Sequence, residues 1–182
     1  LGAILTQNTA WTNVDKALAS LDAATGLVPD RVAELPLPEL EGLIRSAGFF
    51  RQKSRKIRSF LDLMDAYGGL GHGEEDAFFQ CFASVETETM RTALLGVSGI
   101  GPETADCILL YALNRPYVVV DASTRRLFNR HGLVEEAVDY PSLQEFFMDA
   151  LEPDTAVFNE YHALIVRTGK EFCRKTKPRC AS

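Results

Sequence analysis

The stretch of residues 94–121, LLGVSGIGPETADCILLYALNRPYVVVD, decides how this chain folds. Gly99-Ile100-Gly101 lies between a helical pattern at Thr89–Leu95 and a second helix that opens at Pro102, a position that suits proline. Glycine tolerates positive φ and close backbone approach, so the amides of such a turn can point together at an anion. The stretch therefore predicts a helix, a tight glycine hairpin and a helix, with a nucleic-acid phosphate as the natural ligand. A helix–turn–helix corner without a ligand is the alternative.

The end of the same stretch contains a candidate functional carboxylate. Tyr117-Val118-Val119-Val120 carries the chain through the interior to Asp121. An aspartate directly after such an apolar run is either a helix N-cap or a functional group. A helix is expected at Thr124–Arg130, so both roles can hold at once.

Gly-Ile-Gly-Pro-Glu-Thr-Ala-Asp followed by Val-Val-Asp resembles the helix-hairpin-helix (HhH-GPD) DNA glycosylase superfamily, in its endonuclease III group. Within that group the chain looks most similar to the endonuclease III-type 3-methyladenine DNA glycosylases. Further matches are Ile4-Leu-Thr-Gln-Asn-Thr, Gly48-Phe-Phe-Arg-Gln-Lys-Ser and Cys173-x6-Cys180. The resemblance implies an all-α fold of two helical domains, a base-flipping pocket in the cleft between them, and Asp121 as the catalytic aspartate.

The length and hydrophobic content of the chain are enough for one large domain or two small ones with real cores. The chain has 182 residues, 46% of them hydrophobic, and a formal net charge of −6, so DNA contact must come from a local basic face. No transmembrane run or signal peptide is visible, and the start without Met inside an apolar run indicates a fragment. Apart from 117–120 there is no period-2 run, which favours an all-α fold. We expect a helical barrel domain at 1–115 and a C-terminal helical domain at 116–182.

The corner at Gln7-Asn8-Thr9 separates two helical patterns, the second running from about Ala10 to Ala24. Capping is the simplest role of Gln7 and Asn8, whereas the resemblance implies that Gln7 fills the gap left by an extruded base. Trp11 is the only tryptophan, and an indole can stack on a flipped base. Core packing is its alternative role, and the resemblance favours a place in the base pocket.

The segment 49–58, FFRQKSRKIR, combines two aromatic residues with five basic ones at the start of a helix that runs to about Tyr67. A run of charge is usually a solvated helix face, but aromatic wedges beside cations can also part a base step while phosphates are held. The resemblance implies that Phe49 inserts into the opposite DNA strand. We expect Phe50 to pack in the core. Lys53 and Arg55 are then expected to contact DNA.

Two cysteines near the C-terminus match an iron–sulfur loop, although their spacing alone is weak. The resemblance implies that Cys173 and Cys180 are two of the four ligands of a [4Fe–4S] cluster, with the other two beyond the chain end. The full-length protein is expected to hold the cluster, and this fragment is not. Arg174, Lys175, Lys177 and Arg179 form a basic arm for phosphate, or a disordered tail.

Glu103 decides the expected mechanism. Bifunctional members of the resembling group have at this position a lysine that attacks C1′ as an amine, and a carboxylate cannot do so. Favourable contact with the helix dipole would explain Glu103 by itself. We expect a monofunctional glycosylase in which Asp121 stabilises the developing positive charge and activates water. Residues expected at the flipped base are Trp11, Gln7 and Glu103, and the hairpin contacts to DNA are Gly99, Ile100, Gly101 and Thr104.

The expected substrate is double-stranded DNA with a damaged, alkylated base, because a cationic base would be favoured by an aromatic ring and by carboxylates. A mismatch or oxidised-pyrimidine glycosylase, or a non-catalytic HhH DNA-binding module, remains an alternative. The resemblance further implies a monomer without membrane contact, located in the cytoplasm of a prokaryote with its DNA.

Overall fold

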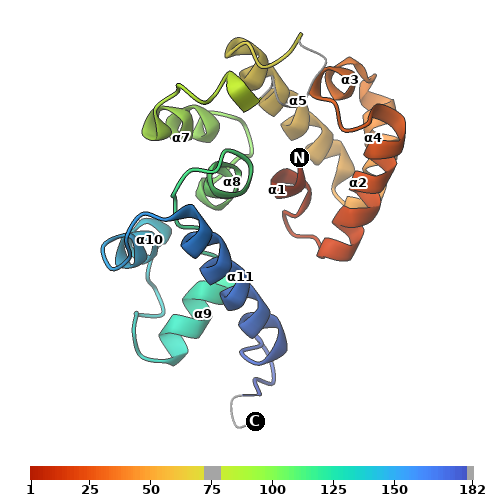
Figure 1. Cartoon of the computed structure of the whole chain (residues 1–182). Coiled ribbons are helices and arrows are strands. Elements are labelled where there is room, and N and C mark those ends of the chain that lie inside the picture. The colour runs from red at the N-terminus through yellow and green to blue at the C-terminus, as the bar shows by residue number, and fades with distance from the viewer. Residues whose placement is uncertain (72–78, 180–182) are drawn as a thin grey trace. The chain divides into compact units, whose positions relative to one another are not determined.

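The computed structural model describes residues 1–71 and 79–179. Its regular elements in these ranges are helices, with no strand among them (Figure 1), so the prediction of an all-α chain is confirmed. The chain divides into two compact units, Leu1–Ala105 and Asp106–Ser182. The division falls within the helix after the hairpin, earlier than the boundary of 115–116 expected from the sequence. No helix in the described ranges is long and apolar enough to cross a membrane.

The first unit contains the helices before the hairpin and the start of the one after it. They are α1 (Gly2–Leu5), α2 (Trp11–Thr25), α3 (Pro29–Glu34), α4 (Leu37–Leu43), the 3₁₀ turn η1 (Arg45–Ala47), α5 (Phe50–Ala66), α7 (Thr87–Leu95) and the first part of α8 (Pro102–Cys107).

The core of this unit follows the helical period. Buried residues recur every three or four positions on α5, at Ile57, Leu61 and Met64 among others. Short α1 lies against both α2 and α5 and contributes the buried side chains of Ile4 and Leu5. The N-terminal corner is therefore tied to the helix of the basic segment.

The hairpin joins α7 to α8 in the predicted way. Gly99 adopts a φ of 83°, in the left-handed region that favours glycine. Between the two glycines, Ile100 is buried and its amide bonds to the carbonyl of Val97 at 3.0 Å. The buried side chain of Ile100 therefore anchors the turn to the first unit. The two glycines on either side of it are exposed.

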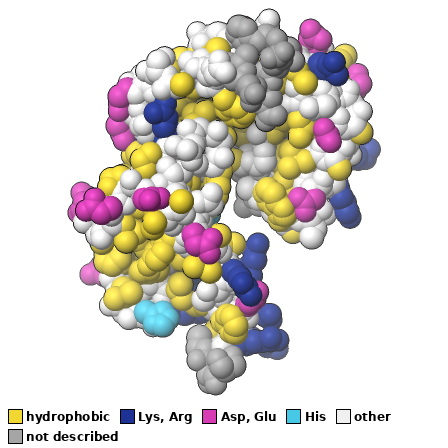
Figure 2. All heavy atoms as spheres, viewed as in Figure 1, with side chains coloured by type: hydrophobic (Ala, Val, Ile, Leu, Met, Phe, Trp, Pro, Cys, Tyr) yellow, Lys and Arg dark blue, Asp and Glu magenta, His cyan; other side chains and the backbone are white. Residues whose placement is uncertain are grey.

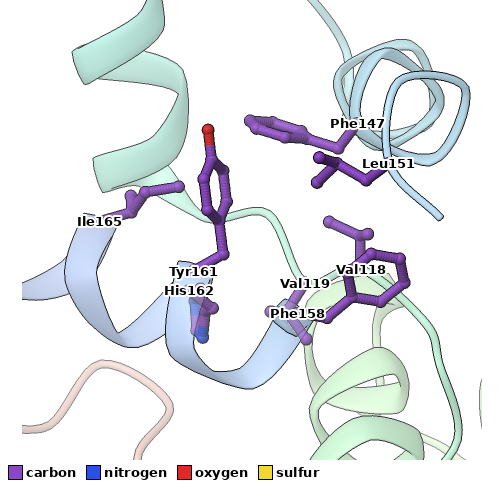
Figure 3. Close-up of a pocket in the computed structure, with 8 residues that line it drawn as sticks. All are labelled: Val118, Val119, Phe147, Leu151, Phe158, Tyr161, His162 and Ile165. Carbon is purple, nitrogen blue, oxygen red and sulfur yellow. The ribbon is translucent and has the colours of Figure 1, made fainter. Parts of the chain in front are cut away.

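In the second unit, α8 runs into the π-helical turn η2 (Ile108–Ala112), and the extended segment up to Val120 leads to α9 (Ala122–Arg130), α10 (Tyr140–Met148) and α11 (Thr155–Glu171). Three buried valines of the extended segment, 118–120, join Leu143, Phe147 and Phe158 in one core. Figure 3 shows a small apolar pocket in this core, where side chains of α10 and α11 meet Val118 and Val119. The buried valine run places Asp121 at its end.

Helices α9 and α11 pack closely at one glycine. A Cβ atom on Gly169 would lie 2.8 Å from the Cβ of Ser123, so the absence of a side chain at Gly169 permits the contact. This approach fixes α9, which begins at Asp121, against α11.

Candidate functional site

The side chain of Gln7 joins the N-terminal corner to the hairpin. Nε2 of Gln7 donates to the carbonyl oxygen of Gly99 at 3.1 Å and to Oγ1 of Thr104 at 2.9 Å. Its Oε1 accepts from Nζ of Lys56 at 2.6 Å. Helix α2 begins after Ala10 without a side-chain cap, so the capping role considered for Gln7 is wrong. Gln7 instead holds the hairpin in place.

The two hairpin glycines have different surroundings. A Cβ atom on Gly99 would lie 2.4 Å from Cε of Lys56, whereas one on Gly101 would meet nothing within 4 Å. Gly101 is exposed and lies outside the left-handed region. Gly99 is therefore required by the fold, and Gly101 leaves open space at the surface of the turn.

Lys53 does not lie on a solvated face. Its side chain is 2% exposed, and Nζ donates to the carbonyl of Leu5 at 2.8 Å, to Oγ1 of Thr9 at 2.7 Å and to the carbonyl of Ala47 at 2.8 Å. Burial, and then the charge of Lys56, lower the pKa of Lys53. The prediction that Lys53 contacts phosphate is wrong, because its three donors are used inside the protein.

Two more of the five basic residues have internal partners. Lys56 bonds to Gln7, and the guanidinium of Arg58 donates to the carbonyls of Ala33 and Leu35. Arg51 and Arg55 are exposed. The basic segment therefore offers two arginines to solvent rather than five cations, and Arg55 stays a candidate for DNA contact.

Two aromatic side chains of the first unit are unusually exposed. Phe49 is 64% exposed and adopts a φ of 47°, a left-handed conformation that is rare for a bulky residue. Trp11, the first residue of α2, is 51% exposed, which rules out the core-packing alternative. Both rings can therefore reach a ligand.

Asp121 is the N-cap of α9, as predicted. Its Oδ1 accepts from the amide of Thr124 at 2.7 Å and from Oγ1 of Thr124 at 2.9 Å, and the amide of Asp121 donates back to that hydroxyl at 3.1 Å. This capping box orients the carboxylate. Its other oxygen, Oδ2, has no hydrogen bond from the part of the chain that the structure describes. Asp121 is half-buried, so Oδ2 combines a fixed position with an unused acceptor.

A second pair of polar side chains in the same unit escaped the sequence analysis. The hydroxyl of Tyr111, on η2, is hydrogen-bonded to Nδ1 of His162 on α11. Burial, Cys107 and the charge of Asp121 raise the pKa of Tyr111 to about 12. Burial lowers the pKa of His162, and the charge of Asp121 opposes this. Tyr111 and His162 are separated by 51 positions in the sequence, so no local pattern indicated that they pair.

Cys173 lies just beyond α11 and is buried. The Sγ atom of Cys173 is 3.3 Å from Nη1 of Arg130, and the carbonyl of Cys173 accepts from Nε of Arg126 at 2.6 Å. Nη1 of Arg130 also donates to the carbonyl of Arg174. Cys180 lies outside the described residues. Figure 2 shows Lys and Arg side chains gathered near the C-terminal end of the chain.

Glu103 and Thr104 lie in the first turn of α8 but differ in exposure. Glu103 is exposed, whereas Thr104 is buried and its Oγ1 accepts from Nε2 of Gln7. A direct DNA contact of the Thr104 side chain would compete with that bond. The structure thus brings Gln7, Gly99 and Thr104 together in the first unit. The second unit contains Asp121 and the bonded pair of Tyr111 and His162.

Known proteins resemble this chain over nearly its whole length. The family described as "HhH-GPD superfamily base excision DNA repair protein" matches residues 1–153. "Putative DNA repair glycosylase MJ1434" of Methanocaldococcus jannaschii is 40% identical over 176 residues, which cover 96% of this chain and 77% of that protein. Endonuclease III of Sulfolobus acidocaldarius is 24% identical over 181 residues, covering 99% and 75%.

Solved structures give the same answer. H. pylori 3-methyladenine DNA glycosylase (MagIII), bound to 1,N6-ethenoadenine, is 28% identical with a TM-score of 0.75, covering 93% of this chain and 82% of that one. A trapped endonuclease III–DNA covalent intermediate aligns with a TM-score of 0.78 at 24% identity, covering 100% and 76%. With the glycine hairpin, the all-helical units and the capped aspartate, these matches show that the chain belongs to the HhH-GPD superfamily of base excision DNA repair proteins and has the endonuclease III fold.

Proposed function

We propose that this protein is a monofunctional DNA glycosylase that hydrolyses the N-glycosidic bond of a damaged, alkylated base. The observation that carries the proposal is the state of Asp121. One carboxylate oxygen is fixed by the capping box, and the other has no hydrogen bond from the described part of the chain. A half-buried carboxylate held in this way is suited to stabilise positive charge in a transition state.

The proposed reaction needs a carboxylate and water. As the bond between C1′ and the base nitrogen breaks, its electron pair leaves with the base and positive charge develops on the sugar. The Asp121 carboxylate stabilises this charge and orients a water molecule, which adds to C1′ and gives up its proton to the carboxylate and then to solvent. Water completes the reaction, so no covalent enzyme intermediate is needed.

An alkylated base is the proposed substrate for two reasons. The half-exposed indole of Trp11 gives a stacking surface, and a cationic base gains more from such a ring than a neutral one. MagIII, a 3-methyladenine DNA glycosylase by name, is similar to the chain in sequence as well as in fold. The similarity to endonuclease III keeps oxidised pyrimidines and mismatches as the alternative substrates.

We propose that double-stranded DNA binds through the hairpin and the exposed groups near the start of α5. Gly101 leaves open space where a phosphate can approach the backbone. A side chain that inserts between bases or contacts a phosphate must be exposed, and both Phe49 and Arg55 are exposed. Ile100 supports the turn from within. We also propose that the protein acts as a monomer in the cytoplasm.

Cys173 and Cys180 are proposed as two ligands of a [4Fe–4S] cluster, which takes four thiolates. The surroundings of Cys173 fit this role, because its sulfur is buried and lies 3.3 Å from the guanidinium of Arg130. No group of three or more His, Cys, Asp or Glu among the described residues could hold a metal by itself. When bound, the cluster would fix the arm formed by Arg174, Lys175, Lys177 and Arg179. In the full-length protein, Cys173→Ser should lower the iron content, and an iron-free, active wild type would contradict the proposal.

Single-turnover base release tests the function. Duplexes with an alkylated, an oxidised or a mismatched base are compared for the wild type and for Asp121→Asn, with thermal unfolding as a control. Asparagine is also a good N-cap, so folding should be retained while release of the alkylated base falls about 100-fold or more. A silent Asp121→Asn would leave Asp121 as a structural cap only. Release of only the oxidised or mismatched base would overturn the substrate class but keep the role of Asp121.

A further inference from the structure

Tyr111 combines an exposed ring with a restrained hydroxyl. The residue is 46% exposed, yet its hydroxyl is bonded to Nδ1 of His162, and the two rings lie 5.9 Å apart between centroids. An exposed tyrosine usually rotates freely and costs entropy when a ligand fixes it. Here the bond to His162 has already fixed the ring.

The backbone at Tyr111 is also unusual. Tyr111 lies in the π-helical turn η2, where the amide of Leu113 bonds to the carbonyl of Ile108 at 3.0 Å. Single π turns inside helices occur frequently at functional sites. The wider turn brings Tyr111 to α11, the helix that contains His162.

His162 is an uncommon partner for a purely structural bond. Its Nε2 is buried and has no hydrogen-bond partner among the described residues. An unpaired buried nitrogen is costly, and a bond that served stability alone would not need a histidine. Figure 3 shows that the neighbouring side chains of Tyr161 and His162 extend from α11 in different directions, and the bond to Tyr111 is made by His162.

The pair and the carboxylate that the proposed function uses belong to elements that pack on one helix. Helix α11, which contains His162, contacts both η2 and α9, and Asp121 is the N-cap of α9. The charge of Asp121 acts on both Tyr111 and His162, and all three belong to the unit Asp106–Ser182. A nucleotide whose sugar reaches Oδ2 of Asp121 therefore approaches the exposed ring of Tyr111 as well.

We propose that Tyr111 is a substrate-positioning residue of this enzyme, whose ring, fixed by the bond to His162, packs against the extruded nucleotide and aligns its sugar with Asp121. His162 acts through Tyr111 and does not itself meet the substrate. The inference rests on the proposed function, because it assigns the two residues to the step that Asp121 performs.

The test is a double-mutant cycle on the single-turnover rate of base release, with duplex affinity and thermal unfolding measured for every variant. Tyr111→Phe and His162→Ala should each lower the rate about tenfold, as expected for one lost hydrogen bond, and change duplex affinity less than about twofold. The double variant should be no slower than either single one. Tyr161→Phe, which removes a hydroxyl from the same unit, is the control and should leave the rate unchanged.

A conservative variant separates positioning from structure. His162→Gln keeps an acceptor for the tyrosine hydroxyl and should recover much of the rate lost in His162→Ala, but only when Tyr111 is present. Unchanged rates in folded Tyr111→Phe and His162→Ala, or losses that multiply in the double variant, would overturn the inference. If Asp121→Asn is inactive in the same assay, only the inference has failed. A wild type that releases no base from any duplex would overturn the proposed function, and the inference with it.

Discussion

The side-chain amide of Gln7 donates to the hydroxyl of Thr104 across 2.9 Å and joins the N-terminal corner of the chain to the helix after the hairpin. The same nitrogen bonds to the carbonyl of Gly99, and the amide oxygen accepts from Lys56. One side chain therefore serves three segments that are distant in sequence. The hairpin is therefore hydrogen-bonded to the N-terminal corner through Gln7.

Gln7→Ala should lower the free energy of unfolding by about 1–3 kcal/mol, because Thr104, Gly99 and Lys56 each lose a partner. Urea denaturation measures this loss. Gln52→Ala, which removes an exposed glutamine from α5, is the matched control and should change stability by less than about 0.5 kcal/mol. If Gln7→Ala and Gln52→Ala changed the free energy of unfolding equally little, the hydrogen bonds of Gln7 would contribute nothing to stability.

The two hairpin glycines should fail in different ways. Gly99→Ala places a Cβ against Lys56 at a φ of 83°, so we expect a loss of about 1–3 kcal/mol in unfolding free energy. At Gly101 an added Cβ would have no neighbour within 4 Å, and the backbone is not in the left-handed region. The stability of Gly101→Val should be nearly that of the wild type, while affinity for a duplex, measured by fluorescence anisotropy, should fall. Wild-type affinity of Gly101→Val would remove this turn from the DNA-binding surface.

Lys53 and Arg55 should also separate stability from binding. Lys53→Met leaves the carbonyls of Leu5 and Ala47 without their donor and should destabilise the protein by about 1–3 kcal/mol, with no change in the salt dependence of DNA affinity. Arg55→Met should leave unfolding unchanged and reduce the slope of log affinity against log salt by about 1. A reduced slope for folded Lys53→Met would contradict the burial of its ammonium group.

His162 gives a prediction for acid stability. Burial lowers the pKa of His162 below its ordinary value of 6.5, so the unfolded chain takes up a proton at a pH where the folded protein does not. The free energy of unfolding should therefore decline as the pH falls below about 6.5. The contribution of His162 to this decline should end once the pH is below the lowered pKa of the folded protein. His162→Gln should remove this part of the pH dependence. His131→Gln changes an exposed histidine and should leave it in place, and identical pH profiles for His162→Gln and the wild type would exclude the effect.

Local patterns predicted the parts of this molecule that depend on neighbouring residues. The capping role of Asp121 and the start of α8 at Pro102 follow from a few adjacent residues, and both are found. Burial of Lys53 could not be foreseen, because its acceptors come from Leu5, Thr9 and Ala47, which only the folded unit brings together. The bond between Tyr111 and His162 likewise joins two helices that no periodic pattern relates.

Glu103 gives a prediction that distinguishes hydrolysis from strand cleavage. An enzyme with an amine at C1′ passes through a Schiff base, which borohydride reduces to a stable protein–DNA adduct. Glu103 offers a carboxylate at the position of that amine, so the wild type should release the base from a damaged duplex without a trapped adduct. The abasic strand should remain intact until alkali is added.

Glu103→Lys, on the exposed first turn of α8, is the informative variant. If the lysine reaches C1′, a trapped product should appear on denaturing gels, and its amount should follow the fraction of base released. Glu103→Gln is the matched control, since it removes the charge without adding a nucleophile, and it should trap nothing. Adduct in the wild type would mean that another amine acts as the nucleophile. The role of Asp121 would survive that result, because a carboxylate can stabilise the sugar cation whether water or an amine attacks it.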